Sequence, residues 1–305
     1  MTVLVTGATG FVGSHVVRQL VASGVDVAII VRPQSSRRRL DDVLEHDRVR
    51  VLEGDLADQA ATARLVESCK PEACIHAAWY AEPGKYLDST QNLDSLRSSF
   101  DLIESLAKAG CKHVVGVGTC FEYAMQDTPL TEDSPTGPFT LYAAAKLAFY
   151  LVAAQRAAQL GMGLAWGRLF YLYGPYEDER RLVPAAIKAL SSGREFPATT
   201  GEQVRDYLHV EDVAAGLCAM SHHRLGGVFN VSSCEPVTIA GLMRTLGELL
   251  GRPELIRLGA LPPRDWDPAY VCGDNQRLRT EAHWSPRYSL RDGLAQTIEW
   301  WKKAA

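Results

Sequence analysis

Thr6-Gly7-Ala8-Thr9-Gly10-Phe11-Val12-Gly13 decides the fold, because it joins a short apolar run to a helical pattern. Val3–Thr6 has the composition of a buried strand, and Val12–Ser23 has apolar residues at helical spacing. In chain order, the three glycines permit a tight turn, a close approach of the backbone to a pyrophosphate, and close packing of helix on strand. We therefore expect a dinucleotide phosphate site made by Gly7, Thr9, Gly10, Phe11, Val12 and Gly13.

The alternation of strand and helix continues through the first half of the chain. The further expected strands are Val25–Val31, Val49–Leu52, Ala73–Ala77, Lys112–Gly118 and Leu164–Tyr171, and the expected long helices are Leu93–Ala109 and Thr140–Leu160. Apolar strands without polar alternation are typical of a parallel sheet that is covered on both faces. The sequence therefore predicts an α/β fold with a doubly wound parallel sheet of the Rossmann type.

The composition changes after Tyr173-Gly174-Pro175, where proline and glycine become frequent and the expected elements shorten. We expect a dinucleotide-binding domain over residues 1–171 and a smaller α+β substrate-binding lobe over residues 172–305. Gly227–Val231 has the composition of another buried strand, so the lobe is expected to be discontinuous, with about 204–233 returning to the main sheet.

The totals exclude several classes of protein. A net charge of -4 over 305 residues lacks the basic field typical of nucleic-acid binding. No apolar run approaches the roughly 18 residues that span a bilayer, and the first strand leaves no room for a signal peptide. The seven cysteines contain no C-x-x-C pair, which favours buried thiols over disulfides or a metal site. We expect a cytoplasmic protein with no metal and with neither nucleic-acid nor membrane partners.

The end of the second strand indicates which dinucleotide binds. NAD enzymes tend to carry an acidic residue there for the ribose 2′-hydroxyl, whereas an arginine accommodates a 2′-phosphate. This chain has Arg32 at that place, followed by Ser35 and Arg37, and no acidic residue. The alternative is a solvated basic loop. The position at the strand end favours NADP(H) over NAD(H).

Three residues suggest hydride-transfer chemistry. Thr119 directly follows the fifth expected strand, where α/β proteins bind ligands. Tyr142 and Lys146 are four residues apart on an expected helix and therefore share one face. An ammonium nearby lowers the pKa of a phenol, which would let Tyr142 act as acid or base near neutral pH. A Tyr-x-x-x-Lys pair alone is common on helix surfaces, and it becomes specific here beside the glycine turn and Thr119.

With these motifs the chain resembles the extended short-chain dehydrogenases/reductases of the NAD-dependent epimerase/dehydratase group. The resemblance runs from end to end and includes the glycine turn, Gly54-Asp55-Leu56, His76-Ala77-Ala78, Gly118-Thr119-Cys120-Phe121-Glu122-Tyr123, Tyr142-Ala143-Ala144-Ala145-Lys146, Tyr173-Gly174-Pro175 and Arg205–Val213. It implies that Thr119, Tyr142 and Lys146 are catalytic, and that Lys146 also holds the nicotinamide ribose. It further implies that Asp55 and Leu56 meet the adenine, and that Ala77 and Ala78 line the ribose and pyrophosphate.

The same resemblance implies a nucleotide-diphosphate sugar as substrate. Arg205 and Arg264 resemble the family's contacts to the diphosphate, although each could instead form a surface ion pair. Trp79 could line the sugar pocket or pack as an ordinary aromatic, and Glu122 could reach the sugar. Tyr171 stands where many family members have a substrate-contacting asparagine, which leaves the identity of the sugar open.

Departures from the family pattern narrow the reaction. Members that are 4,6-dehydratases carry an Asp-Glu pair after the catalytic threonine, whereas this chain has Cys120-Phe121, so dehydration is not expected. Cys120 has no histidine nearby in sequence and is expected to be an ordinary thiol. We expect NADPH-dependent reduction of a 4-keto-6-deoxy nucleotide sugar, with Tyr142 as the acid. The alternative is a nucleotide-sugar 4-epimerase that uses bound NAD.

Two further expectations concern class and assembly. A non-catalytic NADP(H)-sensing protein is the alternative from another class, but loss of the tyrosine or lysine would mark such a protein, and both are present. The helices expected at Leu93–Ala109 and Thr140–Leu160 resemble the family's four-helix dimer interface, so a homodimer is expected.

Overall fold

The computed structural model describes residues 1–262 and 267–304. At its centre lies a seven-stranded sheet with the order β10-β6-β5-β4-β1-β2-β3, in which neighbouring strands are parallel. Its strands are β1 (Thr2–Thr6), β2 (Asp26–Val31), β3 (Val49–Glu53), β4 (Ala73–His76), β5 (His113–Thr119), β6 (Gly163–Leu169) and β10 (Gly227–Val231). The predicted Rossmann-type sheet is confirmed.

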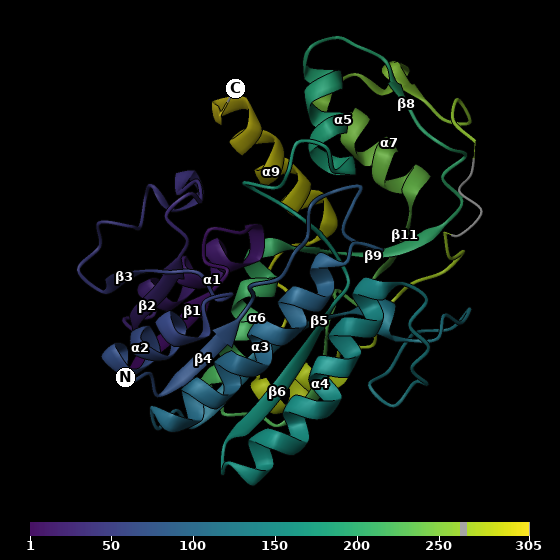
Figure 1. Cartoon of the computed structure of the whole chain (residues 1–305). Helices are drawn as coiled ribbons and strands as arrows, with labels where there is room; N and C mark the ends of the chain where they lie inside the picture. The colour runs from purple at the N-terminus through teal and green to yellow at the C-terminus, as the bar shows by residue number, and fades with distance from the viewer. Residues whose placement is uncertain (263–266, 305) are drawn as a thin grey trace.

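Helices cover both faces of this sheet. On one face α1 (Phe11–Ala22) packs against α6 (Val210–His222), and on the other α3 (Gln91–Lys108) lies between α2 (Gln59–Cys69) and α4 (Leu141–Gln159). Figure 1 shows α3 and α4 running side by side across the strands. The side chains of β1 alternate between two separate buried cores, which is why its sequence is apolar at every position from Val3 to Val5.

The strand order reverses between β1 and β4. From β1 the chain proceeds outward through β2 and β3, and from β4 it proceeds the other way through β5 and β6. Ligands of doubly wound sheets bind outside the strand ends at such a switch point. The turn after β1 lies at this place.

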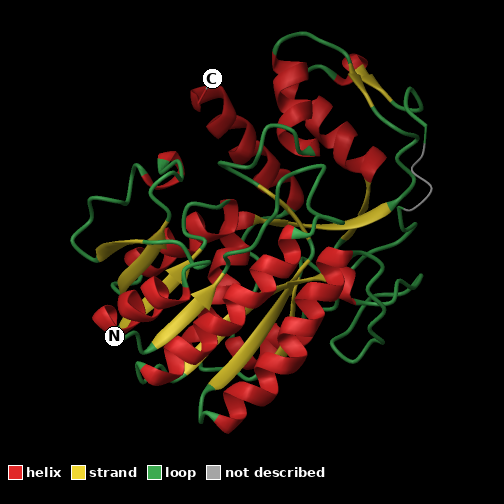
Figure 2. Cartoon of the chain, viewed as in Figure 1, coloured by secondary structure: helices red, strands yellow, loops and turns green. Residues whose placement is uncertain are grey.

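A smaller lobe follows the sixth strand. Its sheet has the order β11-β9-β7, made of β7 (Tyr171–Tyr173), β9 (Val204–His209) and β11 (Pro236–Thr238), and a second small sheet pairs β8 (Phe196–Pro197) with β12 (Ile256–Arg257). Its larger helices, which Figure 2 shows grouped at the top of the molecule, are α5 (Leu182–Ser191), α7 (Ile239–Leu250) and α9 (Leu290–Ala304). A buried core that includes Ile187, Leu246 and Ile298 joins these helices.

The segment that returns to the main sheet differs from the predicted range of about 204–233. It begins at α6 and ends with β10, because β9 instead pairs with β7 and β11 in the smaller lobe. The later helix α8 (Gln276–Ala282) also packs on α6 and β10. The single-turn helices are η1 (Arg38–Leu40), η2 (Cys120–Glu122) and η3 (Pro253–Leu255).

The glycine turn joins β1, α1 and β4 at distances that exclude side chains. Gly7 has φ +70°, and a Cβ on it would lie 2.6 Å from the amide nitrogen of Ala78, just after β4. A Cβ on Gly13 would lie 2.1 Å from the carbonyl oxygen of Gly7. These contacts press the first turn of α1 onto the end of β1.

We therefore expect Gly13→Ala to lower the free energy of unfolding by about 1–3 kcal/mol, the usual cost of overpacking. Gly226→Ala is the matched control, because a Cβ there would meet nothing within 4 Å, and it should change stability by less than about 0.5 kcal/mol. Urea denaturation measures both. Equal changes in the two variants would show that the contact between Gly13 and Gly7 is not tight.

Candidate active site

The predicted cofactor residues lie at the carboxyl ends of adjacent strands. Parallel strands end at one edge of a sheet, so residues far apart in sequence are brought together there. They are Gly7–Gly13 after β1, Arg32 after β2, Asp55 and Leu56 after β3, Ala77 and Ala78 after β4, and Thr119 at the end of β5.

The N-terminus of α1 is suited to an anion. Gly10 is its N-cap residue, and among the described residues no side chain caps this end and no acidic residue occupies its first turn. The first amide N–H groups of a helix have no partner within the helix and carry a partial positive charge. The turn therefore fits the pyrophosphate of a dinucleotide.

The two arginines predicted to hold a 2′-phosphate differ in their surroundings. Arg32 is exposed, and its Nε donates to Ser35 Oγ at 3.4 Å. Arg37 forms an ion pair with Glu53, the last residue of β3. In the described part of the chain Arg32 has no carboxylate partner, so its charge can meet a phosphate without first breaking an ion pair.

Arg39 lies at the cofactor turn and was not singled out from the sequence. Its Nε donates to the carbonyl of Tyr176 at 2.8 Å, and its Nη1 donates to the carbonyl of Thr9 at 3.5 Å. Arg39 therefore links the glycine turn to the start of the smaller lobe. The sequence signal is the run Arg37-Arg38-Arg39, which does not indicate which arginine turns inward.

The structure brings Thr119, Tyr142 and Lys146 together. The hydroxyl of Thr119, at the end of β5, accepts a hydrogen bond from the amide of Phe121 at 3.3 Å. Tyr142 lies in the first turn of α4. One helical turn along α4, Lys146 Nζ donates to the carbonyl of Val117 at 2.6 Å. It lies 6.0 Å from the centre of the Tyr142 ring.

The protonation state of Tyr142 differs from the sequence-based expectation. Burial raises its pKa above the usual range, and Thr119 opposes this only in part. The Lys146 ammonium donates to the Val117 carbonyl rather than to the phenol. Tyr142 is therefore protonated at neutral pH, which is the form that can donate a proton.

Trp79 contacts Lys146. Lys146 Nζ lies 4.0 Å from the centre of the Trp79 ring, close enough for a cation–π interaction. The indole Nε1 donates to Asn92 Oδ1 at 2.9 Å, which fixes the ring against α3. Burial lowers the pKa of Lys146 to about 7.

Tyr86 is a second aromatic residue at the site that sequence reasoning missed. Its ring meets that of Tyr142 edge-on, with 4.8 Å between ring centres. The guanidinium of Arg181 lies 5.3 Å from the centre of the Tyr86 ring. Tyr86 thus connects Tyr142 to the smaller lobe, but it lies in a turn-rich segment with no motif.

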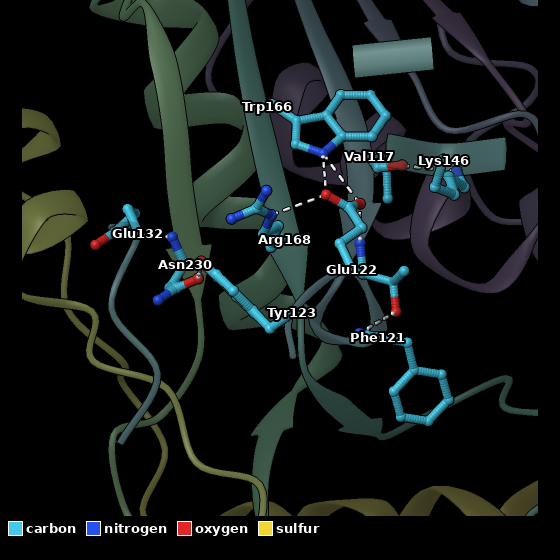
Figure 3. A network of polar contacts seen from close by, with 10 residues as sticks. Val117, Phe121, Glu122, Tyr123, Glu132, Lys146, Trp166, Arg168 and Asn230 are labelled. Atoms are coloured by element: carbon cyan, nitrogen blue, oxygen red, sulfur yellow. Dashed lines mark hydrogen bonds and ion pairs between the residues drawn. The ribbon is translucent and has the colours of Figure 1, made fainter. Parts of the chain in front are cut away.

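Glu122 does not take the position predicted for a sugar contact. Its side chain is 0% exposed and forms an ion pair with Arg168, with 2.8 Å between Oε2 and Nε. Figure 3 shows its carboxylate pointing at the indole of Trp166, whose Nε1 donates to both oxygens at 3.1 and 3.0 Å. Because both oxygens already accept hydrogen bonds inside the protein, this geometry provides no direct contact to a sugar.

Arg205 is buried, with 2% of its surface exposed. It forms an ion pair with Asp267, and Nη1 donates to the carbonyl of Val204 at 2.7 Å. Its guanidinium also lies 5.2 Å from the centre of the half-buried Tyr171 ring. Arg205 therefore forms an ion pair, as the alternative to a diphosphate contact predicts, but the pair lies within the protein rather than on its surface. Arg264, the second predicted diphosphate contact, lies outside the described residues.

Cys120 lies beside the catalytic threonine but is not poised to react. It is buried, and burial raises the pKa of its thiol to about 12. The thiolate is the nucleophilic form of cysteine, and at neutral pH it is nearly absent here. Within residues 1–262 and 267–304, no group of three or more potential metal-ligating side chains is present and no helix is long and apolar enough to cross a membrane.

Comparison with known proteins gives relatives over nearly the whole chain. A UDP-glucose 4-epimerase of Corynebacterium glutamicum is 27% identical, with 95% of this chain and 92% of the relative aligned. A dTDP-glucose 4,6-dehydratase of Streptomyces griseus is 28% identical, with 98% and 94% aligned.

Solved structures share the fold. The UDP-glucose 4-epimerase of Thermotoga maritima, solved with UDP-glucose, is 25% identical, has a TM-score of 0.89 and aligns with 100% of this chain and 99% of its own. DesIV of Streptomyces venezuelae, a dTDP-glucose 4,6-dehydratase solved with NAD bound, is 27% identical, with a TM-score of 0.88 and 99% and 97% aligned.

The sequence pattern of the NAD dependent epimerase/dehydratase family matches residues 3–232, which is most of the chain. The match contains the glycine turn, Thr119, Tyr142 and Lys146. The chain therefore belongs to the NAD dependent epimerase/dehydratase family, and it is an enzyme of the short-chain dehydrogenase/reductase type that uses a nicotinamide dinucleotide.

Proposed function

We propose that this enzyme reduces a 4-keto-6-deoxy nucleotide sugar to the 4-hydroxy sugar with NADPH. The observation that supports the proposal is the grouping of the half-buried Tyr142 with Lys146 on α4, beside Thr119 at the end of β5. Reduction of a carbonyl needs a proton donor at the oxygen, and we assign this role to the phenol of Tyr142.

In this reaction the reduced nicotinamide supplies a hydride. Tyr142 donates its phenolic proton to the carbonyl oxygen, while the hydroxyl of Thr119 donates a hydrogen bond to the same oxygen. The ammonium of Lys146 supplies positive charge beside Tyr142 and so stabilises the tyrosinate that remains. Trp79 and Tyr86 shield these groups from water.

Three observations support the choice of NADP(H). Arg32 follows β2 without a carboxylate partner in the described part of the chain, Ser35 lies beside it, and no acidic residue is present from Val31 to Arg39. The related structure of DesIV was solved with NAD, so the preference proposed here separates this chain from that relative.

The nucleotide-sugar substrate is supported by the relatives and by Arg205. The relatives are named for UDP-glucose and dTDP-glucose. Arg205 provides a buried guanidinium near Tyr171 for a diphosphate, which would have to compete with Asp267. Dehydration is not proposed, because Cys120 and Phe121 follow Thr119 and neither can serve as an acid or base.

Epimerisation at C4 with bound NAD is the second candidate. It is favoured by the UDP-glucose 4-epimerases among the relatives. Epimerisation needs Tyr142 first as a base and then as an acid, whereas reduction needs Tyr142 only as an acid.

An assay with NADPH and a 4-keto-6-deoxy nucleotide sugar tests the proposal, with the absorbance of the reduced nicotinamide as the readout. We expect stoichiometric loss of NADPH, and a rate about 10²–10⁴-fold lower in Tyr142→Phe. Tyr288→Phe is the control. Tyr288 donates a hydrogen bond to Glu211 on α6, and its substitution should leave the rate unchanged.

The alternatives give different results in the same assay. Interconversion of C4 epimers without net loss of NADPH would favour the epimerase. Cellular function that survives Tyr142→Phe would favour a non-catalytic NADP(H)-sensing protein.

The cofactor preference is tested separately by Arg32→Asp. Since a hydrogen bond to a charged group contributes about 1.5–3 kcal/mol, the dissociation constant of NADPH should rise roughly 10- to 100-fold and that of NADH much less. Arg37→Gln is the matched control, because Arg37 is already paired with Glu53 and should affect NADPH less. Equal weakening of both cofactors by Arg32→Asp would refute the 2′-phosphate contact.

We also propose a homodimer formed by α3 and α4. Both helices carry exposed apolar side chains: Leu151 is 55% and Val152 is 53% exposed on α4, and Leu93 is 37% exposed on α3. The like face of a second copy would cover them. Sedimentation should give twice the monomer mass for the native chain and less for Leu151→Lys/Val152→Lys, and a monomeric native chain would contradict the proposal.

A further inference from the structure

Beneath the catalytic residues lies a buried pair of charges that the proposed reaction does not use. Glu122 and Arg168 are 0% and 3% exposed, and 2.8 Å separates Oε2 from Nε. Removing two charges from water is costly, so a buried pair needs good geometry and further hydrogen bonds to persist.

The hydrogen bonds around Glu122 show that it is ionised. Besides Arg168, the Trp166 indole donates to it, and the backbone amide of Thr119 donates to Oε1 at 2.9 Å. All of these partners are donors, which matches an acceptor-only carboxylate and leaves no acceptor for a protonated one. Burial raises the pKa of Glu122, and Arg168 and these donors offset part of that rise.

The same carboxylate determines the position of Thr119. Glu122 accepts from the Thr119 amide while the Thr119 side chain accepts from the backbone of η2, which makes a reciprocal capping box. The cap closes the turn between β5 and η2 and so fixes the backbone of Thr119. Glu122 therefore acts on the reacting hydroxyl through the backbone.

The carboxylate also acts on Lys146. Both side chains lie at the same indole: Lys146 Nζ is 5.9 Å from the centre of the Trp166 ring, and Trp166 Nε1 donates to Glu122 Oε2 at 3.0 Å. Burial lowers the pKa of the Lys146 ammonium to about 7, and the negative charge of Glu122 opposes this shift. Two other titratable groups near Lys146 are His76 on β4 and Tyr142 on α4, while Arg168 on β6 pairs with Glu122 itself. His76 is neutral, because burial lowers its pKa to about 3. Figure 3 shows Arg168 to one side of the Glu122 carboxylate, with Val117 and Lys146 to the other.

We propose that Glu122, held by Arg168 and Trp166, is a positioning residue of the catalytic site that fixes Thr119 through the backbone and keeps Lys146 protonated. For catalysis this rests on the proposed function, since it assumes that Thr119 and Lys146 act in the reaction. The effect on the charge of Lys146 does not depend on the substrate.

Glu122→Gln keeps the size of the side chain and an oxygen for the Thr119 amide, but removes the charge. Without the carboxylate, and with Arg168 left unpaired, the cationic form of Lys146 is less favoured. We expect the pKa of Lys146 to fall by about one unit, the smallest effect usual for a close charge. ¹³C NMR of the labelled lysine side chain measures this in the protein alone, with Lys146→Met to assign the signal.

Two further variants keep the test decisive. Glu122→Gln/Arg168→Gln removes both charges, so that no unpaired arginine remains buried in the folded protein. The pKa of Lys146 in this double variant should still be lower than in the wild type. Trp166→Phe removes a hydrogen bond to Glu122 but keeps the charge of Glu122, so the pKa of Lys146 should fall less than in either Glu122 variant. Wild-type titration of Lys146 in both Glu122 variants would overturn the proposal.

Kinetics then test the link to catalysis. If protonated Lys146 is required, kcat/KM falls as the pH rises through the pKa of Lys146, and in Glu122→Gln this fall should occur about one pH unit lower. We expect kcat to drop more than KM changes. A shifted NMR titration without activity toward any keto sugar would contradict the proposed function and leave the effect on Lys146 intact, whereas an active variant with an unshifted pH profile would contradict the positioning role.

Discussion

The site depends on the close approach of Gly13, in the first turn of α1, to the carbonyl oxygen of Gly7, which follows β1. The space for a Cβ on Gly13 is filled by that oxygen, at 2.1 Å, and the space for one on Gly7 is filled by the backbone after β4, at 2.6 Å. The helix start, the end of β1 and the end of β4 therefore meet without side chains between them. This close approach leaves the amide groups of α1 open to a phosphate where the strand order reverses.

Burial decides the charge states at the other end of the site. It raises the pKa of Tyr142, which stays protonated at neutral pH, and it lowers the pKa of Lys146. The carboxylate of Glu122 opposes that second effect from within the protein, and Arg168 lets it remain ionised there. Lys146 and the ion pair of Glu122 with Arg168 are thus buried together near the end of β5, beside the half-buried Tyr142.

The main sheet could be predicted because its strands are apolar on both faces and are separated by helices. The helix α2 was missed since only Thr62 and Val66 are buried on it, too few to give a helical period. The sequence pattern predicts that the range 204–233 joins the main sheet as one segment, yet β9 pairs with β7. This pairing depends on residues distant in sequence, which the local pattern does not contain.

The catalytic trio could be proposed from motif order, but not the states of its members. The spacing of Tyr142 and Lys146 predicts that they share one helix face. It does not predict that the Lys146 ammonium donates to the Val117 carbonyl and contacts the Trp79 ring. Glu122 follows Thr119 by three residues and was expected at the sugar, because its partner Arg168 is 46 residues away. The roles predicted for Asp55, Leu56, Ala77 and Ala78 remain predictions, since they depend on a bound cofactor.

The most direct measurement of the central claim is the fate of the transferred hydride. NADPH that carries deuterium at the reactive position of the nicotinamide, incubated with a 4-keto-6-deoxy nucleotide sugar, should give a 4-hydroxy sugar with one deuterium at C4. Mass spectrometry and proton NMR of the product locate that atom. A product without deuterium at C4, or C4 epimers that interconvert while the labelled NADPH stays intact, would contradict the account.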